Sequence, residues 1–403
     1  MFAGAMAFLA TACAPHSGSP ATDTASQAQN SAYFVGSDRC ASCHTAEHNA
    51  WQTSQHQMAM QHVSRTAVLA PFAGESLKHH GKTTTFSTHE SQFIIHTDGP
   101  DGKPADYQVK YVFGVSPLQQ YLIELPGGRL QAFTLAWDSR PATAGGQHWF
   151  DLYPDESYQA GDPLHWTGYQ QNWNYMCADC HSTNLRKQYD AASDRFNTTW
   201  SEISVGCEAC HGPGSQHLVW AQQGQPKSMI DKGLPHLLNE RAGVTWTRNA
   251  ISGQPQRSTA RTTSRELDTC ARCHSRRLQL TDKVNAAAPL AQGFQVALLD
   301  QGLYYPDGQM RDEVYNYGSF LQSRMHAAGV TCSDCHDPHT QQLRAPGDLV
   351  CAQCHDASRY ATQKHHFHPE QSDGARCASC HMPTHTYMGV DKRHDHSLRI
   401  PQP

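Results

Sequence analysis

The pattern of hydrophobic and polar positions divides the chain into one stretch with strand periodicity and longer stretches without it. Between about residues 83 and 150, short runs rich in β-branched and aromatic residues are separated by polar turns. These runs span 83–88, 92–97, 107–113, 121–125 and 129–137. Pro126, Gly127 and Gly128, between the last two runs, are typical of a hairpin turn. We therefore expect a small antiparallel β insert at about 83–150, with a scaffold or partner-surface role.

The rest of the chain is rich in turns, and its hydrophobic pattern predicts only short helices, within 45–62, 214–223 and 312–327. Hydrophobic residues make up 38% of the 403 residues, which is lean for a globular chain of this length. A group other than side chains is therefore expected to fill part of the interior.

Cysteine and histidine occur in unusual numbers, 15 and 27. Fourteen cysteines form seven C-x-x-C pairs, and a histidine follows each pair directly, whereas this composition predicts ~0.04 such patterns by chance. We number the motifs 1 to 7 in chain order. Their cysteines are Cys40 and Cys43, Cys177 and Cys180, Cys207 and Cys210, Cys270 and Cys273, Cys332 and Cys335, Cys351 and Cys354, and Cys377 and Cys380. Their histidines are His44, His181, His211, His274, His336, His355 and His381.

This spacing predicts covalently attached haem. On a helical turn, positions i, i+3 and i+4 share one face, so both thiols reach a porphyrin edge while the imidazole points at the iron. Zinc sites, a redox dithiol and structural disulfides are weaker alternatives, because none of them requires a histidine directly after seven identical pairs. We predict seven c-type haems, each held by two thioethers and a proximal histidine.

The predicted fold class is therefore mostly irregular structure plus short α-helices organised around seven c-type haems, with the small β insert. The expected organisation is a signal peptide over 1–13, a flexible tether over 14–32, a four-haem domain over 33–280 that contains the insert, and a three-haem module over 281–403.

The first residues favour export. Residues 1–12 are apolar and too short to span a bilayer, although the basic start of an ordinary signal peptide is missing. Ala10 and Ala12 fit a cleavage site, and Cys13, the one unpaired cysteine, fits a lipoprotein; we favour lipidation. In either case we expect the periplasm or cell surface of a bacterium, with a membrane contact only through a lipid on Cys13.

Residues around the motifs resemble known multihaem proteins. The run 33–44, followed by Trp51 and His56, and the run 206–217 resemble the cytochrome c-554 family. The runs 164–168, 172–174, 318–323, 329–339, 380–383 and 395–397 resemble a related subfamily that is often fused to tetratricopeptide repeats. No such repeats follow here, so a repeat-mediated partner role is not expected. The resemblance implies closely packed haem pairs, mainly bis-histidine iron, and kinship to enzymes that act on hydroxylamine and nitrite.

Twenty further histidines are available as distal ligands. Those that match the family motifs are His56, His165, His217, His339 and His396. We add His368 as the favoured member of the cluster 365–368, whereas His326 is left open. An iron with two histidines only exchanges electrons, whereas an open iron can bind a small molecule.

We therefore expect an electron carrier, whose partners are other redox proteins such as a quinol-oxidising complex or cytochromes. The alternative is an oxidoreductase that acts on a small nitrogen or sulfur compound at one open haem, although no C-x-x-C-K motif of pentahaem nitrite reductases occurs. A third alternative is a structural subunit of a membrane complex or filament. We predict no other catalytic residue. The formal net charge of −5 gives no basic footprint for nucleic acid.

Overall fold

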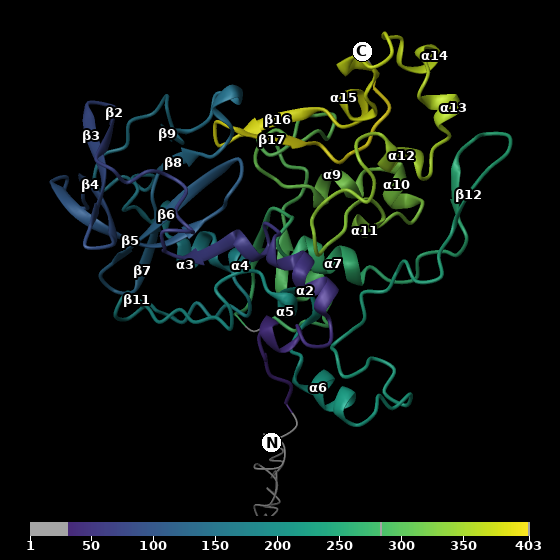
Figure 1. The fold of residues 1–403 in the computed structure, drawn as a ribbon, viewed down its shortest axis with the longest axis horizontal. Coiled ribbons are helices and arrows are strands. Elements are labelled where there is room, and N and C mark those ends of the chain that lie inside the picture. Colours follow the sequence, from purple (N-terminus) through teal and green to yellow (C-terminus); the bar gives the residue numbers. More distant parts are fainter. Residues whose placement is uncertain (1–30, 283, 402–403) are drawn as a thin grey trace, which may run out of the picture.

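The computed structural model describes residues 31–282 and 284–401, in which a large antiparallel sheet lies beside a part built of short helices and loops (Figure 1). The predictions for the signal peptide and Cys13, and nearly all of the predicted tether, lie outside the described residues. The sheet has nine strands in the order β2-β3-β4-β5-β6-β8-β9, with β1 paired to β5 and β7 to β6. The strands are β1 Met60–His62, β2 Glu75–His79, β3 Lys82–His89, β4 Gln92–Asp98, β5 Pro104–Phe113, β6 Leu118–Leu125, β7 Arg129–Ala132, β8 Leu135–Asp138 and β9 His148–Asp151.

The sheet forms because its strands alternate between apolar and polar residues. In β4, Phe93 and Ile95 are buried while the residues between and beside them are more exposed. Phe86 of β3 and Trp149 of β9 stack with ring centroids 3.5 Å apart, and Phe72 packs edge-on against both rings. Burial of each large side chain contributes roughly 1.5–3 kcal/mol, so this aromatic cluster holds the two ends of the sheet together.

The predicted fold class is wrong in this respect. We expected mostly irregular structure and short helices with a small β insert over about 83–150, whereas the sheet extends from Met60 to Asp151 and is the largest regular element. The predicted runs do lie in β3 to β8. The two first strands were missed because their residues are polar: β2 alternates only between half-buried and exposed positions.

Short helices make up much of the remainder. They are α2 Thr45–Gln52, α3 Trp173–Met176, α4 Ala178–His181, α5 Cys207–His211, α6 Ser215–Gln222, α7 Arg265–Ala271, α8 Leu290–Gly293, α9 Tyr317–Leu321, α10 Arg324–Ala327, α11 Cys332–Cys335, α12 Leu349–Ala352, α13 Ala357–Tyr360, α14 Gln363–His366 and α15 Cys377–His381. The helix predicted within 214–223 is α6. The one predicted within 45–62 ends early, at Gln52, and that within 312–327 is divided into α9 and α10.

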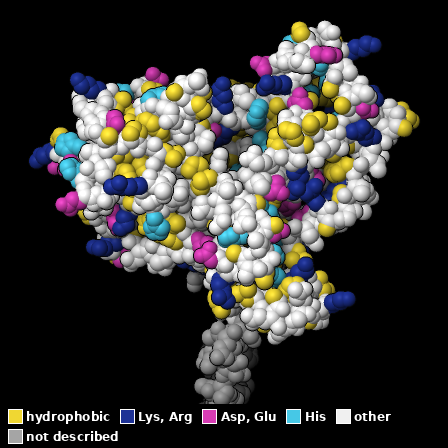
Figure 2. All heavy atoms as spheres, viewed as in Figure 1, with side chains coloured by type: hydrophobic (Ala, Val, Ile, Leu, Met, Phe, Trp, Pro, Cys, Tyr) yellow, Lys and Arg dark blue, Asp and Glu magenta, His cyan; other side chains and the backbone are white. Residues whose placement is uncertain are grey.

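Four two-stranded hairpins complete the fold. They pair β10 Tyr189–Asp190 with β11 Arg195–Phe196, β12 Trp246–Arg248 with β13 Pro255–Arg257, β14 Arg277–Gln279 with β15 Phe294–Val296, and β16 Thr384–Tyr387 with β17 Asp391–His394. The last hairpin extends from the C-terminal part towards the sheet (Figure 1). Val390 in its turn packs against Leu118 and Ala136 of the sheet. Beside this contact, the surface is hollowed between the sheet and the C-terminal part (Figure 2).

Asp98 at the end of β4 makes the sheet sensitive to acid. Its Oδ2 accepts hydrogen bonds from Lys82 Nζ at 2.8 Å and His165 Nε2 at 3.0 Å. Burial raises the pKa of Asp98, but the hydrogen bonds from His165 and Lys82 outweigh it and hold the pKa below its ordinary value. The carboxylate therefore stabilises the fold above the unfolded pKa of about 3.9, and this contribution is lost as the pH falls through the folded pKa.

We expect Asp98→Asn to lower the free energy of unfolding by roughly 1–3 kcal/mol at pH 7, because a buried charge-assisted network is broken. The difference between the thermal melts of the two proteins should be smaller at pH 3 than at pH 7, because below about pH 3.9 the carboxylate of the unfolded wild type takes up a proton. Asp106→Asn is the control, since the Asp106–His96 pair is exposed and should contribute under about 1 kcal/mol. A difference between wild type and Asp98→Asn that is the same at pH 7 and pH 3 would contradict this account.

Candidate haem sites

The motifs form single turns of helix. In four of them the amide of the histidine donates to the carbonyl of the first cysteine, four residues before it. This bond measures 2.9 Å for His44 to Cys40, His274 to Cys270 and His355 to Cys351, and 3.0 Å for His336 to Cys332. Motifs 3 and 7 form the helices α5 and α15, and α4 contains the last four residues of motif 2. Both thiols and the imidazole of a motif therefore lie on one face, as a porphyrin attached at two points requires.

Five motif histidines have a second imidazole ring facing them from a distant part of the chain. The ring centroids of these pairs are 6.1 Å apart for His44–His217, 6.2 Å for His274–His56, 6.5 Å for His211–His339, 6.3 Å for His336–His396 and 6.1 Å for His381–His365. Other ring pairs also lie about this far apart, such as Tyr305 and His385 at 6.2 Å. The five pairs are distinguished because each joins the histidine of a motif to a histidine outside the motifs.

This separation fits an iron between the rings. Two metal–nitrogen bonds of about 2 Å each, with just over ~1 Å from each nitrogen to its ring centre, place the centroids about 6.2 Å apart. The interplanar angles range from 11° to 66°, which is compatible with rings that turn freely about their bonds to a common metal. The five pairs therefore fit the axial ligands of five haems.

The protonation and orientation of these rings also suit iron. Burial lowers the pKa of His211, His274 and His396 to about 4, so these rings are neutral at pH 7, as metal ligands must be. His217 Nδ1 lies 2.8 Å from the backbone carbonyl of Lys232. Donation to that carbonyl leaves the Nε2 lone pair free for the metal.

All fourteen motif cysteines are free of disulfides, so their thiols are available for thioethers. The site residues thus fit c-type haem.

The structure places four of the predicted distal histidines, His56, His217, His339 and His396, in these facing pairs. It does not bring His165 to any motif. His165 is buried beside the sheet, with Nε2 3.0 Å from Asp98 and Nδ1 2.8 Å from Thr167 Oγ1. Both ring nitrogens are engaged, so the prediction of a distal role for His165 is corrected to a structural one.

The favoured residue of the C-terminal histidine cluster is also corrected. His365, and not His368, faces His381. The ring of His368 instead lies against Gly374, where an added Cβ would come within 2.6 Å of it. The sequence pattern could not separate the two residues, because the choice depends on how α14 approaches α15. His326 Nε2 accepts a hydrogen bond from the guanidinium of Arg261 at 2.9 Å, and within the described residues its ring faces no motif histidine.

Motifs 2 and 6 differ from the other five. Within the described parts of the chain, no second histidine ring faces His181 or His355. His181 is oriented as a ligand would be, with Nδ1 3.1 Å from the carbonyl of Ala59, and Phe113 packs edge-on against its ring. The ring in contact with His355 is that of Tyr360. These two motifs are therefore the candidates for open iron.

Contacts between cysteines of different motifs establish which motifs are neighbours. The thiols of four pairs of motifs lie next to each other: Cys40 and Cys207, Cys180 and Cys273, Cys270 and Cys332, and Cys351 and Cys377. Cys210 lies near Cys270, and Cys335 lies near Cys354. These neighbours connect the motifs in the order 1-3-4-5-6-7, and motif 2 branches from motif 4.

Carboxylates that the sequence analysis missed link neighbouring motifs. Glu208, between the cysteines of motif 3, accepts from the amides of Val35 and Gly36, just before motif 1. Glu266 of α7 accepts from the amide of Ser333 and so joins motifs 4 and 5. Asp348 accepts from the amide of Cys377 and joins motifs 6 and 7. Asp179 forms an ion pair with Arg277 and joins motifs 2 and 4. Acidic residues inside or just before a motif were the available signal for them.

We expect Glu208→Gln to destabilise the contact between motifs 1 and 3 by roughly 1–3 kcal/mol. The buried carboxylate also accepts from the amide of Gly214, and a neutral side-chain amide cannot accept from all three donors equally well. Thermal unfolding followed at the Soret band measures the loss, with the exposed Glu370→Gln as control. Equal melting temperatures for the two variants would remove Glu208 from this role.

Comparisons with known proteins agree with these sites. Residues 39–108 and 153–212 match the family model described as "Cytochrome c554 and c-prime", and residues 326–360 match that of the "Doubled CXXCH motif". The matched segments cover less than half of the chain. In these segments the chain is similar to c-type cytochromes that carry several haems.

Curated relatives cover part of the chain. Cytochrome c-552 of Haemophilus influenzae is 28% identical over 205 residues, which is 41% of this chain and 37% of the relative. Cytochrome c-552 of Haemophilus ducreyi is 22% identical over 221 residues, 46% of this chain and 41% of the relative. The chain thus spans about two fifths of the length of these relatives.

A solved structure extends the likeness to most of the fold. The Outer Cell Wall Cytochrome OcwA superposes with a TM-score of 0.54, 17% identity and coverage of 91% of this chain and 79% of that chain. The superposition includes the sheet as well as the motif-bearing part. At this identity the likeness is one of fold.

Proposed function

We propose that the protein is an electron-transfer cytochrome that carries seven haems, one at each motif. The observation that carries the proposal is the set of five imidazole pairs with centroids 6.1–6.5 Å apart. Haem iron held between two histidines alternates between two oxidation states and has no free position for a substrate. The chain's own residues fix the spacing of the motifs and hold the ligands neutral and oriented.

Mass spectrometry and EPR of the purified protein test this proposal together. We expect the polypeptide mass plus seven haems, with low-spin signals from at least five of them. A colourless protein at the bare polypeptide mass would overturn the haem assignment. A full complement of haems that are mostly high-spin would overturn the electron-transfer role.

We place the protein in the periplasm or at the cell surface, because covalent haem attachment takes place outside the cytoplasm. A lipid on Cys13 and redox partners such as a quinol-oxidising complex or other cytochromes belong to the same proposal. In the described ranges 31–282 and 284–401, no helix is long and apolar enough to cross a membrane.

A second candidate function is supported by the surroundings of motif 2. The motif lies against the sheet, where Cys177 and Ala178 pack in one cluster with Met60 and Phe113. On the C-terminal side, Glu313 and Tyr315 are within electrostatic range of Cys177. His181, which no second histidine ring faces within the described residues, thus lies where the sheet meets the C-terminal part.

The C-terminal side of motif 2 carries no excess of positive charge. Arg393 packs over the ring of Tyr315 and is held by Glu313 and Asp391, each at 2.6 Å. Two carboxylates outweigh its single charge, so the second function is supported by the histidine without a facing imidazole alone.

Titration of the holoprotein with nitrite, hydroxylamine and carbon monoxide tests this second function. We expect one high-spin haem to change its spectrum when at least one of these compounds is added. The second function fails if none of the three compounds changes the spectrum of any haem.

A further inference from the structure

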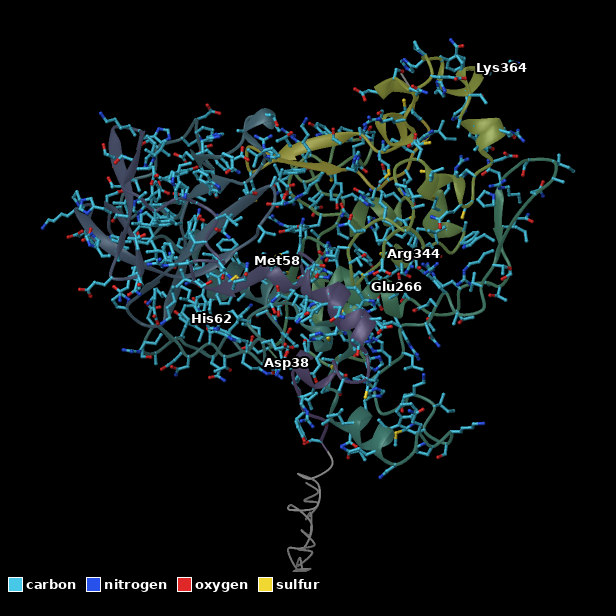
Figure 3. The ribbon with its side chains drawn as sticks, viewed as in Figure 1. Asp38, Met58, His62, Glu266, Arg344 and Lys364 are labelled. Atoms are coloured by element: carbon cyan, nitrogen blue, oxygen red, sulfur yellow. The ribbon has the colours of Figure 1, made fainter. Side chains whose placement is uncertain are left out.

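Motif 4 is the junction of the motif series, and it also lies near the middle of the molecule. Its first cysteine, Cys270, is part of α7. Glu266 on the same helix lies between His62 of β1 and Lys364 of α14 in the side-chain view (Figure 3). Motif 2 joins the other motifs at this junction, so the residues at the contact between motifs 2 and 4 decide how closely the side branch approaches the series.

The contact between motifs 2 and 4 lies at their cysteines. The sulfur of Cys180 in motif 2 is next to that of Cys273 in motif 4. It is also 3.9 Å from the backbone carbonyl of Arg272 and 4.0 Å from that of Cys273. Because these sulfurs are the points of haem attachment, the contact brings the attachment edges of the two sites together.

One buried arginine spans this contact. Arg277, at the start of β14, donates from one guanidinium nitrogen to Asp179 Oδ2 at 2.5 Å and to Cys180 Sγ at 3.3 Å, both in motif 2. Its Nε donates to the carbonyl of Arg272, in motif 4, at 2.7 Å. The guanidinium packs over the ring of Phe294, 4.3 Å from the ring centroid. Hydrogen bonds from two nitrogens of one rigid plane therefore fix motif 2 relative to motif 4.

The contacts of Arg277 are made by polypeptide atoms alone, and its side chain is only 8% exposed. Charge does not explain the arrangement, because the carboxylate of Asp179 balances the guanidinium and the pair adds no net charge beside either motif. The distinguishing property of Arg277 is that it touches two motifs at the edge where they meet.

A second arginine provides the comparison. Arg241 pairs at 3.1 Å with Asp334, which occupies the same position in motif 5 as Asp179 does in motif 2. The side chain of Arg241 is 39% exposed, and the pair joins motif 5 to a turn rather than to a second motif. An arginine paired with the acidic residue of a motif thus need not connect two motifs, as Arg277 does.

We propose that Arg277 is the positioning residue that couples motif 2 to the rest of the series, by holding the attachment edge of motif 2 against that of motif 4. This inference rests on the electron-transfer function proposed above and names the route by which electrons enter or leave the side branch. Each exchange moves one electron from a ferrous to a ferric iron, with no bond or proton transferred. Such exchange slows steeply as the two edges separate, so the contact, rather than a charge, sets the rate at the branch.

Voltammetry of the holoprotein at increasing scan rate tests this inference. Arg277→Lys keeps the charge that pairs with Asp179, but a single ammonium cannot reproduce the fork that holds both motifs. At slow scans we expect the wild type and the variant to deliver the charge of all seven haems. The variant should lose the charge of one haem at a scan rate about tenfold lower than the wild type does.

Two controls separate this role from a general structural one. Arg241→Lys changes the matched pair at motif 5 and should behave like the wild type at every scan rate. In the background Cys177→Ala with Cys180→Ala, which removes motif 2, Arg277→Lys should leave the response of the six remaining haems unchanged. Haem counts by mass spectrometry and spin states by EPR should be the same with and without Arg277→Lys.

The inference is overturned if Arg277→Lys keeps the charge of seven haems up to the same scan rates as the wild type, or if its effect persists in the background without motif 2. If Arg277→Lys attaches fewer than seven haems, Arg277→Gln combined with Asp179→Asn takes its place, since this pair leaves no unpaired charge, and the same two outcomes decide. Failure of the proposed function is a separate result, in which the wild-type protein contains no haem or dithionite fails to reduce it.

Discussion

Replacement of Cys270 and Cys273 by alanine, which removes motif 4, is expected to divide the haems into groups that no longer exchange electrons rapidly. Motif 4 is in contact with motifs 3, 5 and 2, through Cys210, Cys332 and Cys180. Without motif 4, the remaining motifs form three separate groups: motifs 1 and 3, motifs 5 to 7, and motif 2. Voltammetry on an electrode should then detect the charge of one group only, together with a lower yield of folded protein.

The control for this experiment is the replacement of Cys177 and Cys180 by alanine, which removes motif 2. Motif 2 lies on a side branch, so the remaining six haems should still exchange electrons as one set. Haem counts by mass spectrometry confirm that each variant has lost a single haem. The proposed order of motifs is wrong if both variants deliver the same charge to the electrode.

Replacement of His365 by alanine is expected to convert one low-spin haem to high spin, whereas replacement of His368 should leave all haems unchanged. The two residues are three positions apart, but His365 faces His381 and His368 lies against Gly374. Loss of the imidazole also changes the reduction potential of the affected haem, on the order of 100 mV. EPR gives the spin state, and a redox titration gives the potential.

His368→Ala serves as the control for His365→Ala, because both variants remove an imidazole from the same short segment. The number of attached haems should be the same in both, because the cysteines are untouched. High-spin iron in His368→Ala and not in His365→Ala would reverse the assignment and restore the choice that the sequence favoured.

The structure combines two features that a simple carrier does not need. The series 1-3-4-5-6-7 has exposed cysteines at both ends, whereas motif 2 branches off and packs against the sheet. A conduit with an attached small-molecule site would explain both features. The gas and nitrite titrations and the motif 2 variant described above separate these two roles.

The sequence by itself determined the chemistry of the cofactor. The seven motifs depend on covalent spacing within one helical turn, which is a local property that needs no knowledge of the fold. Local context also indicated His56, His217, His339 and His396. Strands in which apolar and polar residues alternate clearly, such as β4, were also predicted, because this pattern is local in the sequence.

Tertiary structure decided the rest, because the deciding interactions join residues far apart in the chain. His165 lies in a sequence motif typical of a haem ligand. In the structure, however, Asp98 at the end of β4 accepts hydrogen bonds from both His165 and Lys82. The sheet is larger than expected because polar strands such as β2 form only when a neighbouring strand supplies hydrogen bonds. The order of the motifs likewise depends on contacts such as Cys40 with Cys207, which no local pattern encodes.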